Sequence, residues 1–280
     1  MLDFWYKFID IILPFQWTSH DFMKNALLAI LLITPLFGLL GTMIVSNKMA
    51  FFSDSLGHGA FTGIAIGSLV GLVSPIFGAV AFSIIFALII TVIKNKSRAS
   101  TDTIIGVFSS IAIALGLVLM SVGGNFNKYS SYLIGDLLSI APSEIALLVF
   151  VFIGIFALWL LIFNKLLIIS VNQSLASSRG VKTLPIEMIF TAIIAVIVTI
   201  SIQWVGLLII NSLLVLPAAA ARNITKNVRS YTLVSIIIAV FSGVSGLVVS
   251  YYFNTATGAT IVLISGLIYF LSLTLKNKFD

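Results

Sequence analysis

Cysteine is absent from this chain of 280 residues, and charged residues are scarce. Without cysteine, disulfide bonds and thiolate metal sites are excluded. Charged residues make up 9% of the chain, hydrophobic residues make up 60%, and the mean hydropathy is +1.21. So few polar residues cannot cover a soluble globule of this size. Most side chains must therefore face lipid or other apolar helices.

The apolar runs are long and unbroken, whereas an outer-membrane barrel would show short segments of alternating polarity. Helices also satisfy their backbone hydrogen bonds within lipid. The sequence therefore predicts an all-α, polytopic transmembrane helical bundle that forms a single domain over residues 1–280. About nine spans of about 17 to 25 residues are expected, at 26–45, 50–72, 76–93, 103–122, 145–169, 186–202, 205–221, 231–252 and 258–275.

The first part of the chain, 1–20, is rich in aromatic residues that include Phe4, Trp5 and Tyr6. Charged residues interrupt this segment and Pro14 ends its first part, so it is typical of an interfacial helix rather than a span. A basic start and a small-residue cleavage site are missing, so we do not expect a cleaved signal peptide.

The positions of the basic residues predict the orientation in the membrane. Placing four loops and the C-terminal tail so that their cations are cytoplasmic puts the N-terminus outside and the C-terminus inside. Twelve of the 15 Lys and Arg residues are then inside, namely Lys48, Lys94, Lys96, Arg98, Lys165, Arg179, Lys182, Arg222, Lys226, Arg229, Lys276 and Lys278. The net charge of +6 is thus a topology signal, and its dispersal over short loops argues against a nucleic-acid partner.

The predicted second span carries glycine at every fourth residue, at Gly59, Gly63, Gly67 and Gly71. Such a stripe allows a second helix to approach to backbone contact, which is how membrane helices pack closely. We therefore expect these four glycines to form a helix-packing face.

The same span contains Asp54 and His58, an i, i+4 pair that shares one face of a helix. An ionisable side chain in a membrane helix costs about 2.5 to 3.5 kcal/mol, so two together need water, an ion or each other. We expect them to bind a metal ion, and the alternative is a structural Asp–His hydrogen bond. Zn²⁺ takes about four ligands and Mn²⁺ about six, so further ligands must come from Asn211, from Ser212 or from a second copy of the pair.

Three other acidic residues have simpler explanations in the sequence. Asp102 and Glu187 lie near the starts of spans, where capping and the helix dipole account for them. Asp136 lies in the outer loop 123–144, where the segment 132–139 is too short to span and is expected to be a re-entrant or surface helix. A capping or solvated role is favoured for Asp136 over attraction of cations.

The longest polar stretch between spans is the segment 170–185, which the charge pattern places in the cytoplasm. It is expected to form a short helix that ends at Gly180 as a C-cap, with Pro185 at the start of the next span. It is either a connecting loop or a docking element for a soluble partner.

Four segments in order along the chain resemble motifs of one family. The segment 52–63 resembles the motif Ser-Asp-Ala-X-Ser-His-Ala-X-X-X-Gly of the membrane permeases of bacterial zinc, manganese and iron ABC importers. The segments 102–109, 132–136 and 205–222 resemble further motifs of that family, and the resemblance extends over 21–275. The sequence differs from the family at Gly57, Gly59 and Asn211, where Ser, Ala and a small apolar residue are usual.

The resemblance implies a homodimeric permease subunit in the bacterial cell membrane. It implies that the chain is not itself an enzyme, because separate cytoplasmic ATP-binding subunits hydrolyse ATP and an extracellular binding protein delivers the metal. Asp54 and His58 match the family's transmembrane metal pair. Ala176, Arg179 and Gly180 fall in an Ala-X-X-X-Gly pattern, which related importers use to contact the ATPase. No permanent cofactor is implied, and the transported ion is expected to be Zn²⁺ or Mn²⁺, with zinc favoured.

Other classes of protein remain as alternatives. An ion-coupled secondary transporter would explain a buried Asp and His, but inverted repeats with broken helices are not evident. An intramembrane metalloenzyme would need more ligands and a general base, and the chain has no His-Glu-X-X-His motif. A permease for a metal chelate is a third alternative, and a bulky chelate would not require the charged pair.

Overall fold

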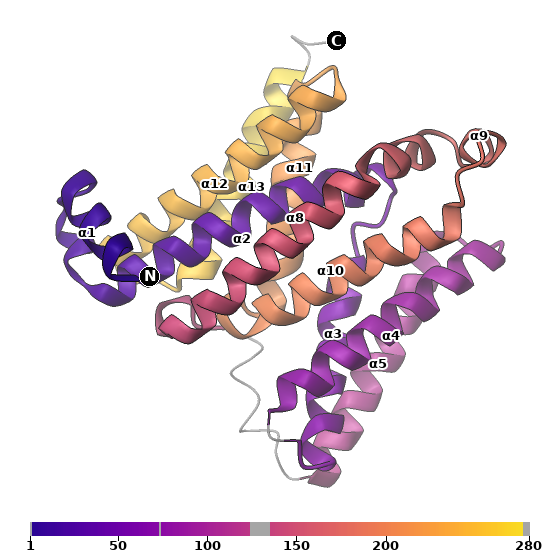
Figure 1. Ribbon diagram of the computed structural model, residues 1–280, viewed down its shortest axis with the longest axis horizontal. Helices are drawn as coiled ribbons and strands as arrows, with labels where there is room; N and C mark the ends of the chain where they lie inside the picture. The colour runs from indigo at the N-terminus through magenta and orange to yellow at the C-terminus, as the bar shows by residue number, and fades with distance from the viewer. Residues whose placement is uncertain (1, 73, 124–134, 277–280) are drawn as a thin grey trace. The chain divides into compact units, whose positions relative to one another are not determined.

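The computed structural model describes residues 2–72, 74–123 and 135–276, and over these residues it is built from helices (Figure 1). The all-α prediction is confirmed. The described α-helices are α1 (Leu2–Ile12), α2 (Asp21–Ser46), α3 (Phe52–Leu69), α4 (Pro75–Lys96), α5 (Thr101–Gly123), α8 (Pro142–Val171), α9 (Gln173–Ser178), α10 (Thr183–Val205), α11 (Leu207–Ile224), α12 (Val228–Phe253) and α13 (Thr257–Lys276). Two 3₁₀-helices, η1 (Gln16–Ser19) and η2 (Leu137–Ser139), complete the set.

Each of the nine predicted spans overlaps one of these helices, but a count of nine spans is not confirmed. In the described part of the chain, 7 helices are long and apolar enough to cross a membrane: α2, α4, α5, α8, α10, α12 and α13. Helix α11 contributes a shorter apolar stretch, Ile209–Ile224. Helix α3 is 18 residues long, and Asp54, His58 and its glycines lower its hydropathy.

The chain folds into two compact units, and α2, α8 and α11 each contribute residues to both. The first unit consists of Met1–Thr42, Gly135–Gly154 and Ser212–Asp280. The second consists of Met43–Ile134 and Ile155–Asn211. The candidate metal pair and the segment 170–185, which the charge pattern predicts to be cytoplasmic, both belong to the second unit.

In the second unit, α3 packs against α4, α5 and α10, and α4 packs against α10 (Figure 1). Polar side chains link these apolar helices at two places. The Thr62 hydroxyl on α3 donates a hydrogen bond to the Ala112 carbonyl on α5 at 2.6 Å. The hydroxyls of Thr91 on α4 and Thr191 on α10 are hydrogen-bonded at 2.8 Å. These bonds satisfy hydroxyls that would otherwise be buried without a partner.

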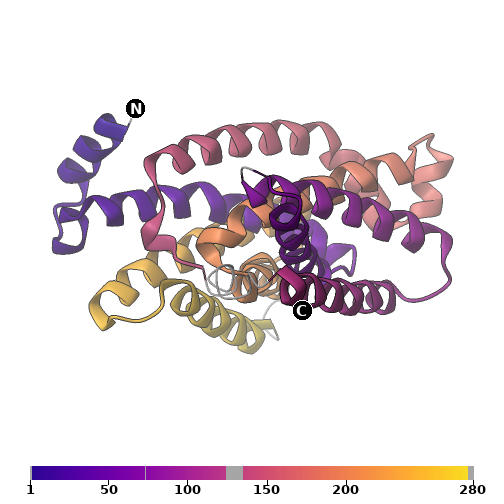
Figure 2. The same ribbon diagram turned by 90° about the horizontal axis from the view of Figure 1, so that it is seen from below.

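In the first unit, α12 and α13 form an antiparallel pair, coloured yellow in Figures 1 and 2. The connection between them begins at Asn254, whose left-handed backbone (φ 50°) ends α12. Close approach depends on Gly246, because a methyl group built there would lie 2.6 Å from the Cα of Ile261. Helix α2 approaches α12 in the same way at Gly38, whose carbonyl accepts a hydrogen bond from the Ser235 hydroxyl at 2.7 Å.

The N-terminal helix α1 is held against the start of α2 by a buried lysine. The Lys24 ammonium lies 2.8 Å from the Asp10 carboxylate and 3.6 Å from that of Asp21. The indole N–H of Trp5 donates to the Lys24 carbonyl at 3.0 Å. Phe4 on α1 is 78% exposed, and the interfacial position of α1 stays a prediction.

Candidate functional site

Asp54 and His58 project from the first two turns of α3, the helix that begins at Phe52. The Nε2 atom of His58 lies 3.5 Å from Oδ2 of Asp54. This separation is longer than the 2.7 to 3.2 Å of ordinary N–H···O hydrogen bonds. The pair is therefore close enough to share a ligand but too far apart for a good direct hydrogen bond.

The pair also stands out by its accessibility. Between residues 52 and 65 of α3, every side chain is buried except those of Asp54 and His58. Their side chains are 39% and 21% exposed. A carboxylate and an imidazole thus remain accessible on a stretch of helix, residues 52–65, whose other residues are buried.

The glycines of α3 form its contact with α4. A methyl group built on Gly63 would lie 2.6 Å from the Cα of Ala79 and 2.7 Å from the carbonyl oxygen of Gly78. At Gly59 it would meet the ring of Phe86 at 3.0 Å, and at Gly67 the carbonyl oxygen of Pro75 at 3.1 Å. Two helix backbones are therefore in direct contact here, which larger side chains would prevent.

Helix periodicity relates this contact to the metal pair. Gly63 follows Asp54 by nine residues, and at about 100° per residue these two positions lie on opposite sides of the helix. Helix α4 therefore supports the back of α3. It does not pack against the side that carries the Asp54 carboxylate.

Gly71 does not share in the packing, although the glycine spacing predicted that it would. Helix α3 ends at Leu69, and a methyl group built on Gly71 would have no neighbour within 4 Å. Its φ of +75° is the left-handed conformation that follows many helices. The amide of Leu72 donates to the Gly67 carbonyl at 3.0 Å, which closes the helix end. Gly71 therefore terminates α3, and the prediction extended the packing glycines by one repeat too many.

The further ligands proposed from the sequence are only partly brought together. Asn211, on α11, accepts a hydrogen bond from the hydroxyl of Ser53, the buried neighbour of Asp54. It therefore lies beside the first turn of α3, where its side-chain oxygen is hydrogen-bonded to Ser53 rather than to the pair. Ser212 belongs to the other compact unit. Among the residues that the structure describes, no group of three or more His, Asp or Glu side chains is placed to hold a metal ion.

The segment 170–185 forms the short helix α9, and Gly180 follows it as expected. The Asn172 side chain caps its start by accepting from the Leu175 amide at 3.1 Å. At its end the amide of Val181 donates to the Ala176 carbonyl at 3.1 Å, and the amide of Gly180 donates to that of Ser177 at 3.0 Å. These two bonds and the φ of +76° at Gly180 define a Schellman motif.

The three residues predicted for ATPase coupling differ in what they expose. Ala176 is fully buried, so its methyl group seats α9 on its own chain. Arg179 and Gly180 are exposed, and only Arg179 offers a side chain. Leu175, which the sequence analysis did not single out, is 43% exposed on the same helix. The outer surface of α9 therefore combines a cation with an apolar side chain.

Two of the acidic residues have the explanations that the sequence suggested, and one does not. Asp136 accepts from the Leu138 amide at 3.1 Å and so caps η2; residues 132–134 of that predicted short helix lie outside the described residues. Asp102 lies in the first turn of α5 and is exposed. Glu187 is buried, and its carboxylate lies 3.1 Å from the Lys94 ammonium. The dipole explanation for Glu187 was therefore incomplete, because its partner is 93 residues away in sequence.

Comparison with known proteins identifies the family of this chain. The model of the ABC 3 transport family matches residues 19–276. The chain belongs to the ABC 3 transport family. The zinc uptake system membrane protein ZnuB of Haemophilus influenzae is 31% identical over 262 residues, covering 92% of this chain and 99% of that protein. The manganese import permease ScaB of Streptococcus gordonii is 30% identical over 261 residues, covering 92% of this chain and 94% of that protein.

A solved structure agrees in fold as well as in sequence. PsaBC from Streptococcus pneumoniae, solved in complex with Fab, matches with a TM-score of 0.79 and 28% identity, over 99% of this chain and 100% of that chain. The resemblance to metal ABC permeases is thereby confirmed. This family member is a multi-pass protein of the bacterial cytoplasmic membrane and a transport subunit. The family favours an ABC permease over an ion-coupled secondary transporter.

Proposed function

We propose that this chain forms the translocation path of an ATP-driven importer for Zn²⁺, and that Asp54 and His58 bind the ion transiently during transport. The observation that carries the proposal is the accessible pair on α3, with its Nε2–Oδ2 separation of 3.5 Å. Relatives that share about a third of the sequence are named as zinc or manganese permeases.

The geometry of the pair suits two ligands of one ion. With Zn–N and Zn–O bonds of about 2.0 to 2.2 Å and a tetrahedral angle, the two donor atoms would lie about 3.4 Å apart. The observed 3.5 Å is close to that value. Octahedral ligands at 90° with the same bond lengths would lie about 3.0 Å apart. This comparison supports Zn²⁺ as the first candidate.

Mn²⁺ is the second candidate because ScaB is named as a manganese permease. A carboxylate suits Mn²⁺ and an imidazole suits Zn²⁺, so one of each admits both ions. The ligand number separates them, because Mn²⁺ needs about six donors and Zn²⁺ about four.

Two donors from one chain leave a zinc ion half coordinated. A homodimer would supply a second Asp54 and a second His58, and the four donors would complete a tetrahedral site. Dimerisation is therefore part of the proposal, since the described residues of a single chain hold no group of three or more candidate ligands.

Transport by this family member also requires partners. We infer that cytoplasmic ATP-binding subunits contact α9 through its exposed surface, at Arg179 and Leu175. Buried Ala176 and the turn at Gly180 hold that surface in place. An extracellular metal-binding protein would deliver the ion to the opposite side of the membrane.

The test is the metal content of cells that lack this chain, grown with each ion added back. We expect low cellular zinc, restored by the wild-type chain and by Asp102→Asn but not by Asp54→Asn. Asp102 is a suitable control because it is an exposed carboxylate in the first turn of α5. Low manganese with normal zinc would select Mn²⁺ instead. Normal content of both metals would contradict the proposed function.

A further inference from the structure

Glu187 is a buried carboxylate with a defined set of partners. It is the fifth residue of α10, past the first turn in which the helix dipole acts. Its side chain is 8% exposed, and its Oε2 atom lies 3.1 Å from the Lys94 ammonium. The Asn95 amide donates to the same oxygen at 2.7 Å. A carboxylate this enclosed needs polar partners, and the ion pair with Lys94 and the hydrogen bond from Asn95 supply them.

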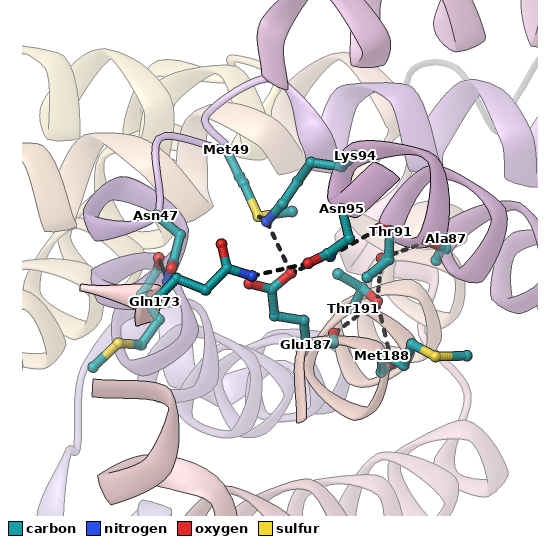
Figure 3. A network of polar contacts seen from close by, with 11 residues as sticks. Asn47, Met49, Ala87, Thr91, Lys94, Asn95, Gln173, Glu187, Met188 and Thr191 are labelled. Carbon is teal, nitrogen blue, oxygen red and sulfur yellow. Dashed lines mark hydrogen bonds and ion pairs between the residues drawn. The ribbon is translucent and has the colours of Figure 1, made fainter. Parts of the chain in front are cut away.

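Asn95 connects this carboxylate to α9. Its carbonyl oxygen accepts from the Gln173 side-chain amide at 2.9 Å, while its own amide group donates to Glu187 (Figure 3). Gln173 is the first residue of α9 and is exposed. One side chain of α4 therefore joins the short cytoplasmic helix to the buried charge on α10.

Lys94 extends the network toward α3. Its ammonium lies 3.9 Å from the sulfur of Met49, a buried residue in the short connection that leads into α3 (Figure 3). Asp54 follows Met49 by five residues. The hydrogen bond between Thr91 and Thr191 is a second link from α4 to α10, deeper in the same unit. All these residues belong to the second compact unit.

We propose that Glu187, with Lys94 and Asn95, is a positioning group that transmits the movement of α9 to the metal-binding helix. Displacing α9 would break the bond from Gln173 and release Asn95 from its orientation. The Glu187 carboxylate would then lose one of its two partners. The position of Lys94 would then be less fixed. The position of Met49, in the connection that leads into α3, would be less fixed as well. Coupling between distant sites is carried by networks of hydrogen bonds and ion pairs that have two discrete arrangements.

This inference rests on the proposed function, because α9 matters for transport only if a partner binds it. The experiment uses the complex of this chain with its ATPase subunits in proteoliposomes, and measures zinc transported per ATP hydrolysed. The variants are Gln173→Ala and Glu187→Gln. The control is Ser178→Ala, because the Ser178 hydroxyl donates within α9, to the Leu175 carbonyl at 2.9 Å.

We expect both variants to bind the ATPase subunits and hydrolyse ATP, with zinc per ATP lowered by about fivefold or more, the lower end of typical coupling factors. Ser178→Ala should match the wild type. The double variant should fall no further than Glu187→Gln alone, because both changes interrupt one chain of contacts. A purely stabilising role would lower the melting temperature and leave this ratio unchanged.

The inference is overturned if zinc per ATP is unchanged in Gln173→Ala and Glu187→Gln, or if the double variant shows the product of the two separate losses. Gln173→Ala keeps the test decisive if Glu187→Gln fails to fold, because Gln173 is exposed. A wild-type complex that moves no metal overturns the proposed function and this inference with it. A transporting wild-type complex with unchanged ratios in the variants overturns the inference alone.

Discussion

Replacing Gly63 by alanine should destabilise the protein, although alanine is the better helix former. The added methyl group would lie 2.6 Å from the Cα of Ala79, 2.7 Å from the carbonyl oxygen of Gly78 and 2.9 Å from the Cβ of Phe82. Nonbonded carbons normally lie about 3.5 to 4.0 Å apart, so α3 and α4 must separate locally by about 1 Å. Two of the three contacts are backbone atoms, which cannot move away by rotating a side chain.

The expected magnitude follows from two opposing terms. Overpacking a close contact costs about 1 to 3 kcal/mol, and backbone contacts favour the upper end. The better helix propensity of alanine returns about 1 kcal/mol. The free energy of unfolding therefore falls by about 2 kcal/mol. This change lowers the melting temperature of a protein of this size by roughly 4 to 8 °C. Melting in detergent, followed by the loss of the monodisperse peak on size exclusion, measures this shift.

Two matched variants make the test specific. Gly106→Ala on α5 has no atom within 4 Å of the new methyl group and should melt at or above the wild-type temperature. Gly59→Ala meets the ring of Phe86 at 3.0 Å and should fall between the other two, because a ring can shift. If Gly63→Ala melts like Gly106→Ala, the close contact between α3 and α4 does not exist and the assigned helix face is wrong.

Two further variants probe the surroundings of the pair and the exposed surface of α9. Asn211→Ala should lower the free energy of unfolding by about 1 to 3 kcal/mol, because it leaves the buried Ser53 hydroxyl unpaired. Zinc uptake should be kept. Complete loss of uptake at normal folded yield would instead make Asn211 a metal ligand. Arg179→Glu should prevent co-purification of the ATPase subunits with a folded chain, whereas Ala176→Glu should reduce the folded yield itself because Ala176 is fully buried. Retained ATPase binding by Arg179→Glu would place the contact in another cytoplasmic segment, such as 222–229.

The sequence predicted the local features well because they depend on local chemistry. Asp54 and His58 share a face of α3 by helix periodicity alone, and the cap at Gly180 follows from the preference of glycine for positive φ. The extent of the glycine stripe could not be read in this way, because a period of four does not reveal where α3 ends. Gly71 lies beyond that end.

The contacts that were missed are the ones between distant segments. Glu187 and Lys94 are each ordinary at a helix end, and nothing local indicates that they form a pair across 93 residues. The burial of Ala176 likewise depends on how α9 rests on its own chain. One feature of the sequence could have indicated this cluster. Lys94, Asn95 and Glu187 are three polar residues near the same predicted side of the membrane.

The central claim is that Asp54 and His58 bind the transported ion on an ATP-driven path. The most direct measurement is ATP-dependent uptake of radioactive zinc by proteoliposomes that contain this chain and its ATPase subunits, with Asp54→Asn and His58→Gln compared against the wild type and Asp102→Asn. The account predicts that uptake falls to background in the first two variants, at wild-type folded yield and ATPase binding, and stays normal in Asp102→Asn. Wild-type uptake by both Asp54→Asn and His58→Gln would contradict it.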